Sequence, residues 1–461
     1  MSVLPEGIAP AEPPVPRDSA LGVVVRLTPD GLEVLLGRRA RRARFMPGNL
    51  VFPGGVLEAQ DGDGEDRWRR GASRELEEET GLAIPPQAWR DLGERVTPPL
   101  FPVRFRTRFF LAEVPPGTEA PAPPSPEEIE ALAFHRPAQV LDAWEGSQAL
   151  VPPPVLPLLR ALAAADLGDV AERLREVNAL EARTPRIEFL PDVWMLPLRT
   201  RTLPPATHTN AWMPGRARFV VLDPGTADAE ELHALARAVQ RRRDEGASLE
   251  AIVLTHGHPD HVSGARPAAE AFGVPVRAHA HVLDALAGVL GPCAGAPLAD
   301  GDALDLGGLR LVTLETPGHA PGHLAFHLPE RHAVLVGDLL SSLSTILVDP
   351  EEGDMDAFLA SLARVGALRC RTLLPAHGGP LPARALDDAL AHRLARAQRI
   401  LDALHGGATS LRAIAEAAYA DTPDAPAPLR ERQTLAHLHA LERAGRVART
   451  GNLWGVARGE P

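Results

Sequence analysis

The sequence contains no lysine, so all 48 of its Lys and Arg residues are arginine. Without lysine the chain cannot form a Schiff base, a Ser-Lys dyad or a Walker-A phosphate loop. Cysteine is also scarce: only Cys293 and Cys370 occur, and neither belongs to a Cys-x-x-Cys pair. Two cysteines cannot build a disulfide framework or a four-thiolate metal site. Any metal ion must therefore be held by histidine and carboxylate side chains.

Long uncharged apolar runs are absent, and so is the basic flank of a signal peptide, which predicts a cytoplasmic protein without a membrane span. The net charge of −12 repels a phosphate backbone, and 12 Phe, 6 Trp and 1 Tyr offer few platforms for stacked bases. Nucleic acid could therefore bind only through local features. The 461 residues are 45% hydrophobic and 23% charged, which is typical of a globular enzyme of about two to four domains.

Histidine is unevenly distributed along the chain. Ten of the 17 histidines lie between His256 and His377, whereas only His135 lies in the first 200 residues. This asymmetry predicts two different chemistries in one chain. Between residues 187 and 382, short β-rich runs such as AIVLT and AVLVGD alternate with helical patterns, which is typical of an α/β domain.

The densest group of potential metal ligands follows the run AIVLT. His256, His258, Asp260 and His261 occur within six residues, where a glycine and a proline force a tight loop. So many imidazole and carboxylate groups in one loop are costly unless a cation is present. Later strand ends present further ligands in the same way, namely His319, Asp338 and His377. Together these residues predict a site for two metal ions.

This pattern resembles the metallo-β-lactamase superfamily, in which His-x-His-x-Asp-His is followed by a histidine, an aspartate and a last histidine. The resemblance covers roughly residues 187–385 and implies an αββα sandwich. It implies two ligand sets joined by a bridging carboxylate: His256, His258 and His319 for one Zn²⁺, Asp260, His261 and His377 for the other, and Asp338 between them. Iron or manganese would also suit such ligands.

The same resemblance implies the chemistry of this site. Two Zn²⁺ ions lower the pKa of a bound water towards about 7, so metal-bound hydroxide attacks a carbonyl or phosphoryl centre and no residue is acylated. Asp260 would be the catalytic carboxylate that orients this water or carries its proton. His323 is a candidate for substrate binding or for positioning the site. Asn210 and Asp223 are expected to shape the floor of the site rather than to bind metal.

A group of acidic residues lies near the other end of the chain. Glu75, Glu78 and Glu79 have i, i+3 and i+4 spacing and share one face of a helix. Their charges repel one another unless a divalent cation neutralises them. Gly81 is expected to end this helix.

The glutamate segment resembles the Nudix box, and residues 19–165 would then be a Nudix domain of α/β/α fold. The resemblance extends to the Nudix proteins near those that cleave coenzyme A and related diphosphates. It implies Mg²⁺ or Mn²⁺ on the three glutamates and catalysis by Glu75 and Glu78. It also implies that Arg74 anchors the catalytic glutamate and lies at the substrate.

The box departs from the family pattern in its spacing. The acidic residue eight positions before Arg74 is Asp66, which follows Gly55 by eleven positions instead of six. An insertion is therefore expected within residues 60–65. Upstream of the box, a run of arginines offers itself as a phosphate clamp, with Arg44 as a candidate for substrate binding; the run consists of Arg38, Arg39, Arg41, Arg42 and Arg44. A solvated turn is an equal alternative for this run.

The tail of the chain follows a helical pattern and then a hairpin pattern. Helices are predicted at residues 393–405, 411–419 and 429–444, before a hairpin with a Gly-Asn turn. This order is typical of a winged helix and resembles the tail of the lactamase-like endoribonuclease branch. Arg443, Arg446 and Arg449 would then contact an extended anionic substrate such as single-stranded RNA. The alternative is that the tail packs on the sheet domain or pairs two chains.

The predicted fold class is an α/β multidomain protein. Its expected parts are a disordered tail at residues 1–18, a Nudix-like domain at 19–165, a helical linker at 166–186, a metallo-β-lactamase domain at 187–390 and a winged-helix-like domain at 391–461. The predicted function is a metallohydrolase with a dinuclear zinc site and a Mg²⁺-dependent Nudix site for coenzyme A-like diphosphates. The alternative is a zinc-dependent ribonuclease or thioesterase whose Nudix unit only binds or senses a nucleotide.

The expected partners are small-molecule substrates with a diphosphate, ester or thioester group. Single-stranded RNA is an alternative partner, no membrane is expected, and oligomerisation is left open.

Overall fold

The structure is a computed structural model that describes residues 12–40, 42–43, 46–99, 101, 103–164, 167–183 and 187–457. The chain divides into two compact units, and the division falls between residues 194 and 195. The tail predicted for residues 1–18 lies mostly outside the described residues, and the first strand begins at Arg17. Within the described residues, no helix is both long enough and apolar enough to cross a membrane.

The described part of the first unit contains a seven-stranded sheet. The order along it is β3-β2-β1-β6-β5, with β4 paired to β1 and β7 paired to β2. The strands are β1 (Arg17–Thr28), β2 (Gly31–Arg39), β3 (Leu50–Val51), β4 (Gly54–Val56), β5 (Arg90–Val96), β6 (Phe105–Val114) and β7 (Ile129–His135). β1 runs parallel to β6 and antiparallel to β2, so the longest strands form the centre of the unit.

Side chains of β1 alternate between the two faces of this sheet. Ala20 and Val24 pack with α1 (Arg67–Thr80). Val23 and Val25 belong to the core on the other face, which is covered by α2 (Pro137–Glu145), α3 (Leu156–Ala164) and α4 (Val170–Arg183). Successive residues of a strand point to opposite faces, so one strand serves both cores. The result is the predicted α/β/α arrangement.

Helix α4 covers most of the segment that was expected to be a linker at residues 166–186. Val170 and Leu174 on this helix are buried in the core of the first unit. The segment therefore packs as part of the first unit and is not a separate linker.

Helix α1 carries the three glutamates of the box. Trp68, Ala72 and Leu76 recur at intervals of four residues and are all buried, so they fix one face of the helix on the sheet. The helix ends at Gly81, whose φ of 74° is a left-handed conformation that glycine adopts at little cost. This packing determines the direction of the glutamate-bearing face.

The second unit contains two sheets. One includes β13-β12-β11-β10-β9, and the other has the order β14-β15-β16-β17-β18-β19. The strands of the first sheet are β9 (Val193–Arg199), β10 (His208–Pro214), β11 (Arg218–Leu222), β12 (Ser248–Val253) and β13 (Val276–Arg277), and β8 (Ile187–Leu190) precedes them. The strands of the second are β14 (Ala303–Asp305), β15 (Arg310–Glu315), β16 (Leu324–Leu328), β17 (Ala333–Gly337), β18 (Thr372–Pro375) and β19 (Leu381–Pro382).

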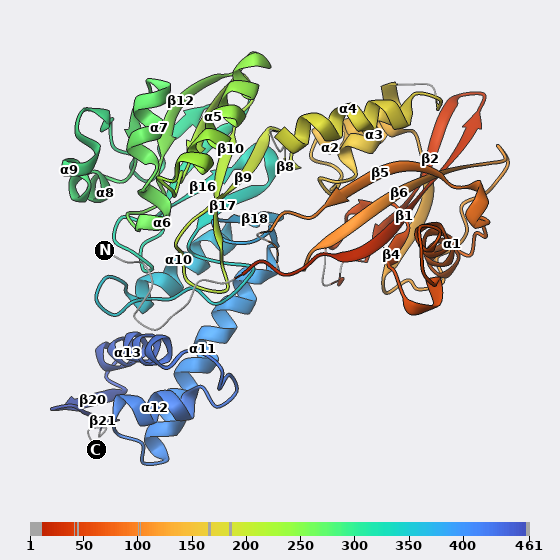
Figure 1. The fold of residues 1–461 in the computed structure, drawn as a ribbon. Helices are drawn as coiled ribbons and strands as arrows, with labels where there is room; N and C mark the ends of the chain where they lie inside the picture. The colour runs from red at the N-terminus through yellow and green to blue at the C-terminus, as the bar shows by residue number, and fades with distance from the viewer. Residues whose placement is uncertain are drawn as a thin grey trace. The chain divides into compact units, whose positions relative to one another are not determined.

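Helices cover the outer faces of the two sheets. α5 (Ala229–Asp244) and α7 (Ala265–Phe272) lie beside β12 (Figure 1). α10 (Met355–Ala367) packs on the second sheet, where Phe358 and Leu362 share a core with Val334 and Leu373. Shorter helices in the loops are α6 (Pro259–Val262), α8 (Ala280–Ala285) and α9 (Ala287–Leu290). These layers form the predicted αββα sandwich.

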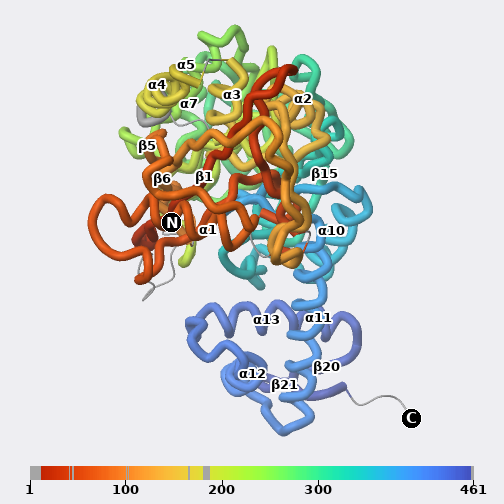
Figure 2. The backbone as a smooth tube through the Cα atoms, turned by 90° about the vertical axis from the view of Figure 1, so that its right-hand side faces the viewer, coloured from red at the N-terminus to blue at the C-terminus, as the bar shows by residue number. Residues whose placement is uncertain are grey.

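The tail begins with one long helix, α11 (Arg384–His405), which runs out of the sandwich (Figures 1 and 2). This helix continues through residue 390, where the sequence predicts a domain boundary. α12 (Leu411–Ala418), α13 (Ala427–Arg443) and the hairpin of β20 (Val447–Thr450) and β21 (Leu453–Val456) follow. Ile400, Ile414, Leu438 and Trp454 form their shared core. The described tail thus has the predicted order of helices and hairpin.

Candidate functional site

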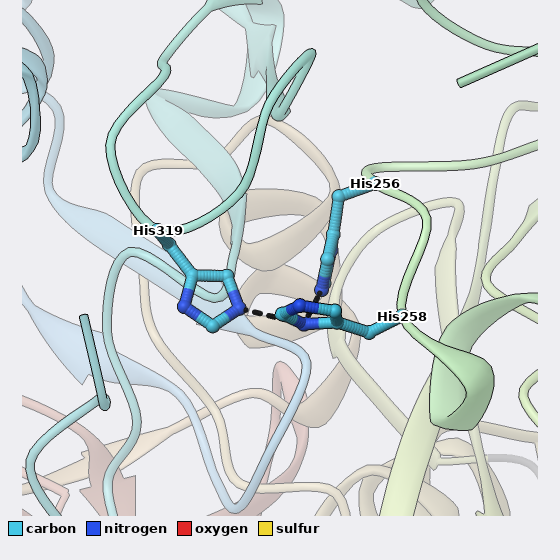
Figure 3. A group of neighbouring side chains, drawn as sticks. All are labelled: His256, His258 and His319. Atoms are coloured by element: carbon cyan, nitrogen blue, oxygen red, sulfur yellow. Dashed lines mark hydrogen bonds between the residues drawn. The ribbon is translucent and has the colours of Figure 1, made fainter. Parts of the chain in front are cut away.

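Three histidine rings meet beyond the ends of β12 and β15 (Figure 3). Nδ1 of His258 lies 2.9 Å from Nε2 of His256 and 3.0 Å from Nε2 of His319. Nδ1 of His258 carries either one hydrogen or one lone pair, so it can form a hydrogen bond with only one of these two nitrogens. At the other contact, two lone pairs face one another. Convergent imidazole lone pairs are the arrangement that binds a transition-metal cation.

The outer nitrogens of two of these rings identify the tautomers. Nδ1 of His319 donates to the carbonyl oxygen of Leu347 at 2.8 Å, and Nε2 of His258 donates to the carboxylate of Glu352 at 3.1 Å. Because a carbonyl or carboxylate oxygen only accepts, the hydrogen sits on the outer nitrogen and the inner nitrogen keeps its lone pair. Burial lowers the pKa of His319 to about 3, which keeps this ring neutral.

A second group consists of Asp260, His261 and His377. Oδ2 of Asp260 lies 3.6 Å from Nε2 of His377 and 4.0 Å from Nε2 of His261. Nδ1 of His261 donates to Asp223 at 2.9 Å, and Nδ1 of His377 donates to the carbonyl oxygen of His208 at 2.9 Å. These outer bonds direct the Nε2 nitrogens of both rings into the group.

Asp338 lies between the two groups. Its Oδ1 is 3.6 Å from Nε2 of His261 and 3.4 Å from Nε2 of His377, and its Oδ2 is 3.5 Å from Nε2 of His319. Burial alone would raise the pKa of Asp338, but His377 and His261 lower it well below its usual value. The carboxylate is therefore charged and turns one oxygen towards each group, as a bridging ligand does.

The donor set fits two metal ions. Three overlapping groups each have all their potential ligand atoms within 4.8 Å: His256, His258 and His319; His256, His261 and Asp338; Asp260, His261 and His377. Nε2 of His261 and Oδ1 of Asp338 are buried without a hydrogen-bond partner among the described residues. Buried polar atoms are rarely left unpaired, so these atoms fit a cation. Imidazole and carboxylate together suit zinc, iron or manganese.

Asp223 supports the site from beneath, at the end of β11. Its carboxylate accepts hydrogen bonds from the backbone N and the Oγ1 of Thr255, at 2.8 and 2.7 Å, besides that from His261. Asn210 donates from Nδ2 to the carbonyl oxygens of Pro375 and Gly378, at 3.0 and 2.8 Å. Both residues therefore hold loops that carry candidate ligands.

His323 lies behind the site rather than in it. Its side chain is fully buried, its Nδ1 lies 2.9 Å from Oγ1 of Thr316, and its Nε2 accepts a hydrogen bond from the backbone N of Asp338 at 3.1 Å. A ring without exposed surface cannot contact a substrate. The structure therefore corrects the substrate-binding alternative and places His323 as a support of Asp338.

The glutamate box of the first unit is organised around Arg74. Nη1 of Arg74 lies 2.9 Å from Oε1 of Glu75 and 2.9 Å from Oε2 of Glu78, and Nη2 donates to the carbonyl oxygen of Val56 at 3.0 Å. Glu79 instead accepts from the backbone N of Gly54 at 2.8 Å. Arg74 therefore holds two of the three glutamates.

Burial raises the pKa of Glu79 to about 7, and the hydrogen bond from the backbone of Gly54 and the charge of Arg39 on β2 partly oppose this shift. Burial likewise raises the pKa of Glu75. Among the described residues, groups of three ligands within 4.8 Å occur around the histidines, and the glutamates do not form one. The box thus supplies carboxylates near one another, but these groups lie further apart than the potential ligand atoms of the histidine site.

The acidic partner of Arg74 is Asp61 and not Asp66. Nε and Nη2 of Arg74 donate to the two carboxylate oxygens of Asp61 at 3.0 and 3.1 Å, and Asp61 is 2% exposed. Asp66 is exposed and pairs with Arg69. Asp61 follows Gly55 by six positions, so the insertion begins after Asp61 and the spacing from Gly55 is regular. The spacing from Arg74 was the misleading signal.

Arg44, the candidate for phosphate binding, lies outside the described residues, as does Arg41.

Residues 16–153 match the NUDIX domain, and residues 205–377 match the Metallo-beta-lactamase superfamily. The chain carries a Nudix domain fused to a metallo-β-lactamase domain. The glutamate box lies within the first match and the ligand groups lie within the second. Both domains belong to families of hydrolases.

Relatives of the metallo-β-lactamase domain include two kinds of protein. The chain is 34% identical over 161 residues to a hydroxyacylglutathione hydrolase of Hyphomonas neptunium, covering 35% of this chain and 57% of the relative. It is 28% identical over 240 residues to a lactamase-like protein of Aspergillus sp., covering 49% of this chain and 70% of the relative. The chain spans 57 to 66% of the length of the hydroxyacylglutathione hydrolases of Hyphomonas and Cereibacter. These names do not single out the endoribonuclease branch.

Two solved structures are similar to parts of the chain. A metallo-beta-lactamase family protein from Thermus thermophilus has 26% identity and a TM-score of 0.48, covering 58% of this chain and all of that chain. A NUDIX hydrolase from Alicyclobacillus acidocaldarius has 24% identity and a TM-score of 0.31, covering 34% of this chain and 96% of that chain.

Proposed function

We propose that the metallo-β-lactamase domain is a dinuclear metallohydrolase for thioesters. The observation that supports this most is the convergence of histidine nitrogens around Asp338, whose oxygens lie 3.4 Å from His377 and 3.5 Å from His319. Two zinc ions held there would act as Lewis acids and would lower the pKa of a bound water towards about 7.

Three aspartates of the chain would contribute to this reaction besides the metal ions. Asp338 stays charged and would keep both ligand groups on one carboxylate, while Asp223 fixes the orientation of the His261 ring. Asp260, which is 6% exposed, would orient the attacking water from the side of the second group or take up its proton. No side chain needs to act as the nucleophile.

The proposed substrate class rests on both domains. The relatives named hydroxyacylglutathione hydrolase favour a thioester at the histidine site. The Nudix domain favours a diphosphate, and an acyl-coenzyme A carries both groups. We therefore favour coenzyme A thioesters, with Mg²⁺ or Mn²⁺ on Glu75, Glu78 and Glu79 for diphosphate cleavage. Arg74 would keep Glu75 and Glu78 oriented, and the positive charge of Arg39 lowers the pKa of Glu79 against the effect of burial.

A substrate screen tests this proposal. Zinc-loaded full-length protein is mixed with acyl-coenzyme A thioesters, acylglutathione thioesters, lactones and nitrocefin, and release of thiol or ring opening is followed. We expect thioesters to be hydrolysed with the highest kcat/KM. Hydrolysis of lactones alone, or of none of these compounds, would reject the thioester assignment.

A ribonuclease is the second candidate, because the tail has the helix order and hairpin of a winged helix. The structure supports RNA binding by the tail arginines less than the sequence did, because two of these arginines have partners within the chain. Arg443 pairs with Asp354 at 2.9 Å and Asp356 at 2.7 Å, and Arg449 donates to the carbonyl oxygen of Gly451 and lies over the Trp454 ring. Cleavage of a fluorescent single-stranded RNA by wild type and by an Arg446→Ala, Arg449→Ala variant across salt concentrations tests it. Equal rates without salt dependence would make the tail architectural.

A nucleotide sensor is the alternative for the Nudix domain. Mg²⁺-dependent phosphate release from diphosphates, measured for wild type and Glu78→Gln, separates the two roles. An enzyme loses release in the variant, whereas a sensor shows no release in either protein and still binds the nucleotide.

A further inference from the structure

Two of the three histidines in the first ligand group are oriented by one segment of chain. Nδ1 of His319 donates to Leu347, and Nε2 of His258 donates to Glu352. Both acceptors belong to residues 346–354, between β17 and α10, which we name the acceptor segment. Outer hydrogen bonds of this kind fix the ring orientation and tautomer of a metal ligand.

The tail holds the acceptor segment on both sides of Leu347. Arg393 on α11 donates from Nη2 to the carbonyl oxygen of Ile346. On α13, Oε1 of Gln433 accepts from the backbone N of Val348 at 3.1 Å. The residues that flank the carbonyl acceptor are therefore both bonded to tail side chains.

The same segment is tied to the tail at two further points. Arg432 on α13 donates to both carboxylate oxygens of Asp349, at 2.6 and 2.7 Å. Arg443, at the end of α13, pairs with Asp354, and the backbone N of Asp354 in turn donates to Gly318 at 2.8 Å. Gly318 directly precedes His319, so the tail also reaches the backbone of the ligand loop.

The burial of these tail residues is difficult to explain by packing alone. Arg393 is 2% exposed and Gln433 is 5% exposed. Removing a guanidinium or an amide from water is costly unless its hydrogen bonds are replaced, and apolar side chains would fill the same space without this cost. The bonds to Ile346 and Val348 provide a reason for polar residues at these positions.

We propose that the C-terminal tail is a positioning part of the metal site, which sets the rings of His319 and His258 through the acceptor segment. The proposal rests on the proposed metallohydrolase function. Gln433 and Arg432 are positioning residues: they contact the acceptor segment and act on the ligands through it.

Matched variants separate positioning from general stability. Gln433→Met keeps the volume and removes the bond to Val348, while the Nε2 of Gln433 has no partner to lose among the described residues. Its control is Gln398→Met, because Gln398 is an exposed residue of α11 whose side chain bonds to the exposed Asp402. Arg432→Ala is the second variant. Its control is Arg412→Ala, which breaks an exposed pair with Glu416 on α12.

The first readout needs no metal. In metal-free protein labelled with ¹⁵N-histidine, His319 should show the Nδ1–H tautomer, and its signal is assigned by its loss in His319→Gln. We expect Gln433→Met and Arg432→Ala to give a mixture of tautomers and both controls to match wild type. Wild-type spectra for both positioning variants would overturn the proposal.

The second readout is metal affinity. Competition titrations with Zn²⁺ should show about tenfold weaker binding of one ion in the positioning variants and unchanged binding in the controls. Unchanged affinity in all four variants would also overturn the proposal. A wild-type protein that binds no Zn²⁺ would instead reject the proposed function, and the tautomer measurement would still decide whether the tail orients His319.

Discussion

Arg74 and Asp61 form a bidentate ion pair across the insertion in the Nudix box, with N···O distances of 3.0 and 3.1 Å. Asp61 is 2% exposed, and Arg74 also bonds to Glu75 and Glu78. The pair therefore links the loop before α1 to the glutamates on that helix.

We expect Asp61→Ala to destabilise the Nudix domain by about 1.5–3 kcal/mol, the cost of losing hydrogen bonds between charged groups. Mg²⁺-dependent diphosphate cleavage should fall as well, because Arg74 loses the partner that fixes it. Asp66→Ala is the control and should change stability by less than about 0.5 kcal/mol, since Asp66 is exposed. Urea unfolding of both variants provides the comparison, and equal midpoints would contradict the central role of Asp61.

The same pair predicts a dependence on pH. Burial alone would raise the pKa of Asp61, but hydrogen bonds from Arg74 and from the backbone of Glu58 lower it overall. A lowered pKa in the folded state means that the pair stabilises the protein above the unfolded carboxyl pKa of about 3.9 and loses this effect as pH falls through the folded value. The stability difference between wild type and Asp61→Asn should therefore be larger at pH 7 than at pH 3. A difference that grows on acidification would refute this assignment.

Asp338→Ala should reduce the metal content from about two transition-metal ions per chain to about one, because one carboxylate faces both ligand groups. Elemental analysis of the purified proteins measures this content. His281→Ala serves as the control, because His281 is an exposed histidine of the same domain. One ion or none in folded wild type would contradict a dinuclear site.

The two hydrolytic reactions should be separable. His258→Ala should abolish thioester hydrolysis and leave Mg²⁺-dependent diphosphate cleavage intact, and Glu78→Gln should have the opposite effect. The reason is that the glutamates of the box and the histidine groups belong to different compact units. Parallel assays of both reactions on each variant test this independence. Loss of both activities in a folded single variant would indicate one composite site.

The two cysteines should differ in reactivity towards a thiol reagent at pH 8. Cys370 is 7% exposed and burial raises its pKa to about 11, so little thiolate is present and access is poor. Cys293 is partly exposed. Mass spectrometry after brief labelling should find one modified residue, Cys293, and Cys370 should react only after unfolding. Rapid labelling of Cys370 in the folded protein would contradict its burial.

The ligand residues of the histidine site could be found from sequence because their signal is local. Four of them stand within six residues after β12, and the others directly follow hydrophobic strands. Strands of two packed sheets that end near one another bring such loops together, so strand ends alone predicted which residues would meet. The buried face of α1 has the same kind of local signal, because Trp68, Ala72 and Leu76 recur at helical spacing.

The partner of Arg74 could not be chosen from sequence in the same way. Asp61 and Asp66 both precede Arg74, and counting back from the helix favoured Asp66. The short turn at residues 59–61 buries Asp61 beside α1 and leaves Asp66 at the helix start. Only the three-dimensional path of the inserted loop decides which carboxylate reaches the guanidinium.

The sequence by itself determined the two domain types, the ligand residues and the order of elements in the tail, because each depends on residue type and short-range spacing. The tertiary structure decided that His323 supports Asp338 and that Leu347 orients His319. A backbone carbonyl has no sequence signature, since every residue carries one. Its use as an acceptor depends on where the acceptor segment lies, and contacts with α11 and α13, 47 and 85 residues further along the chain, set that position.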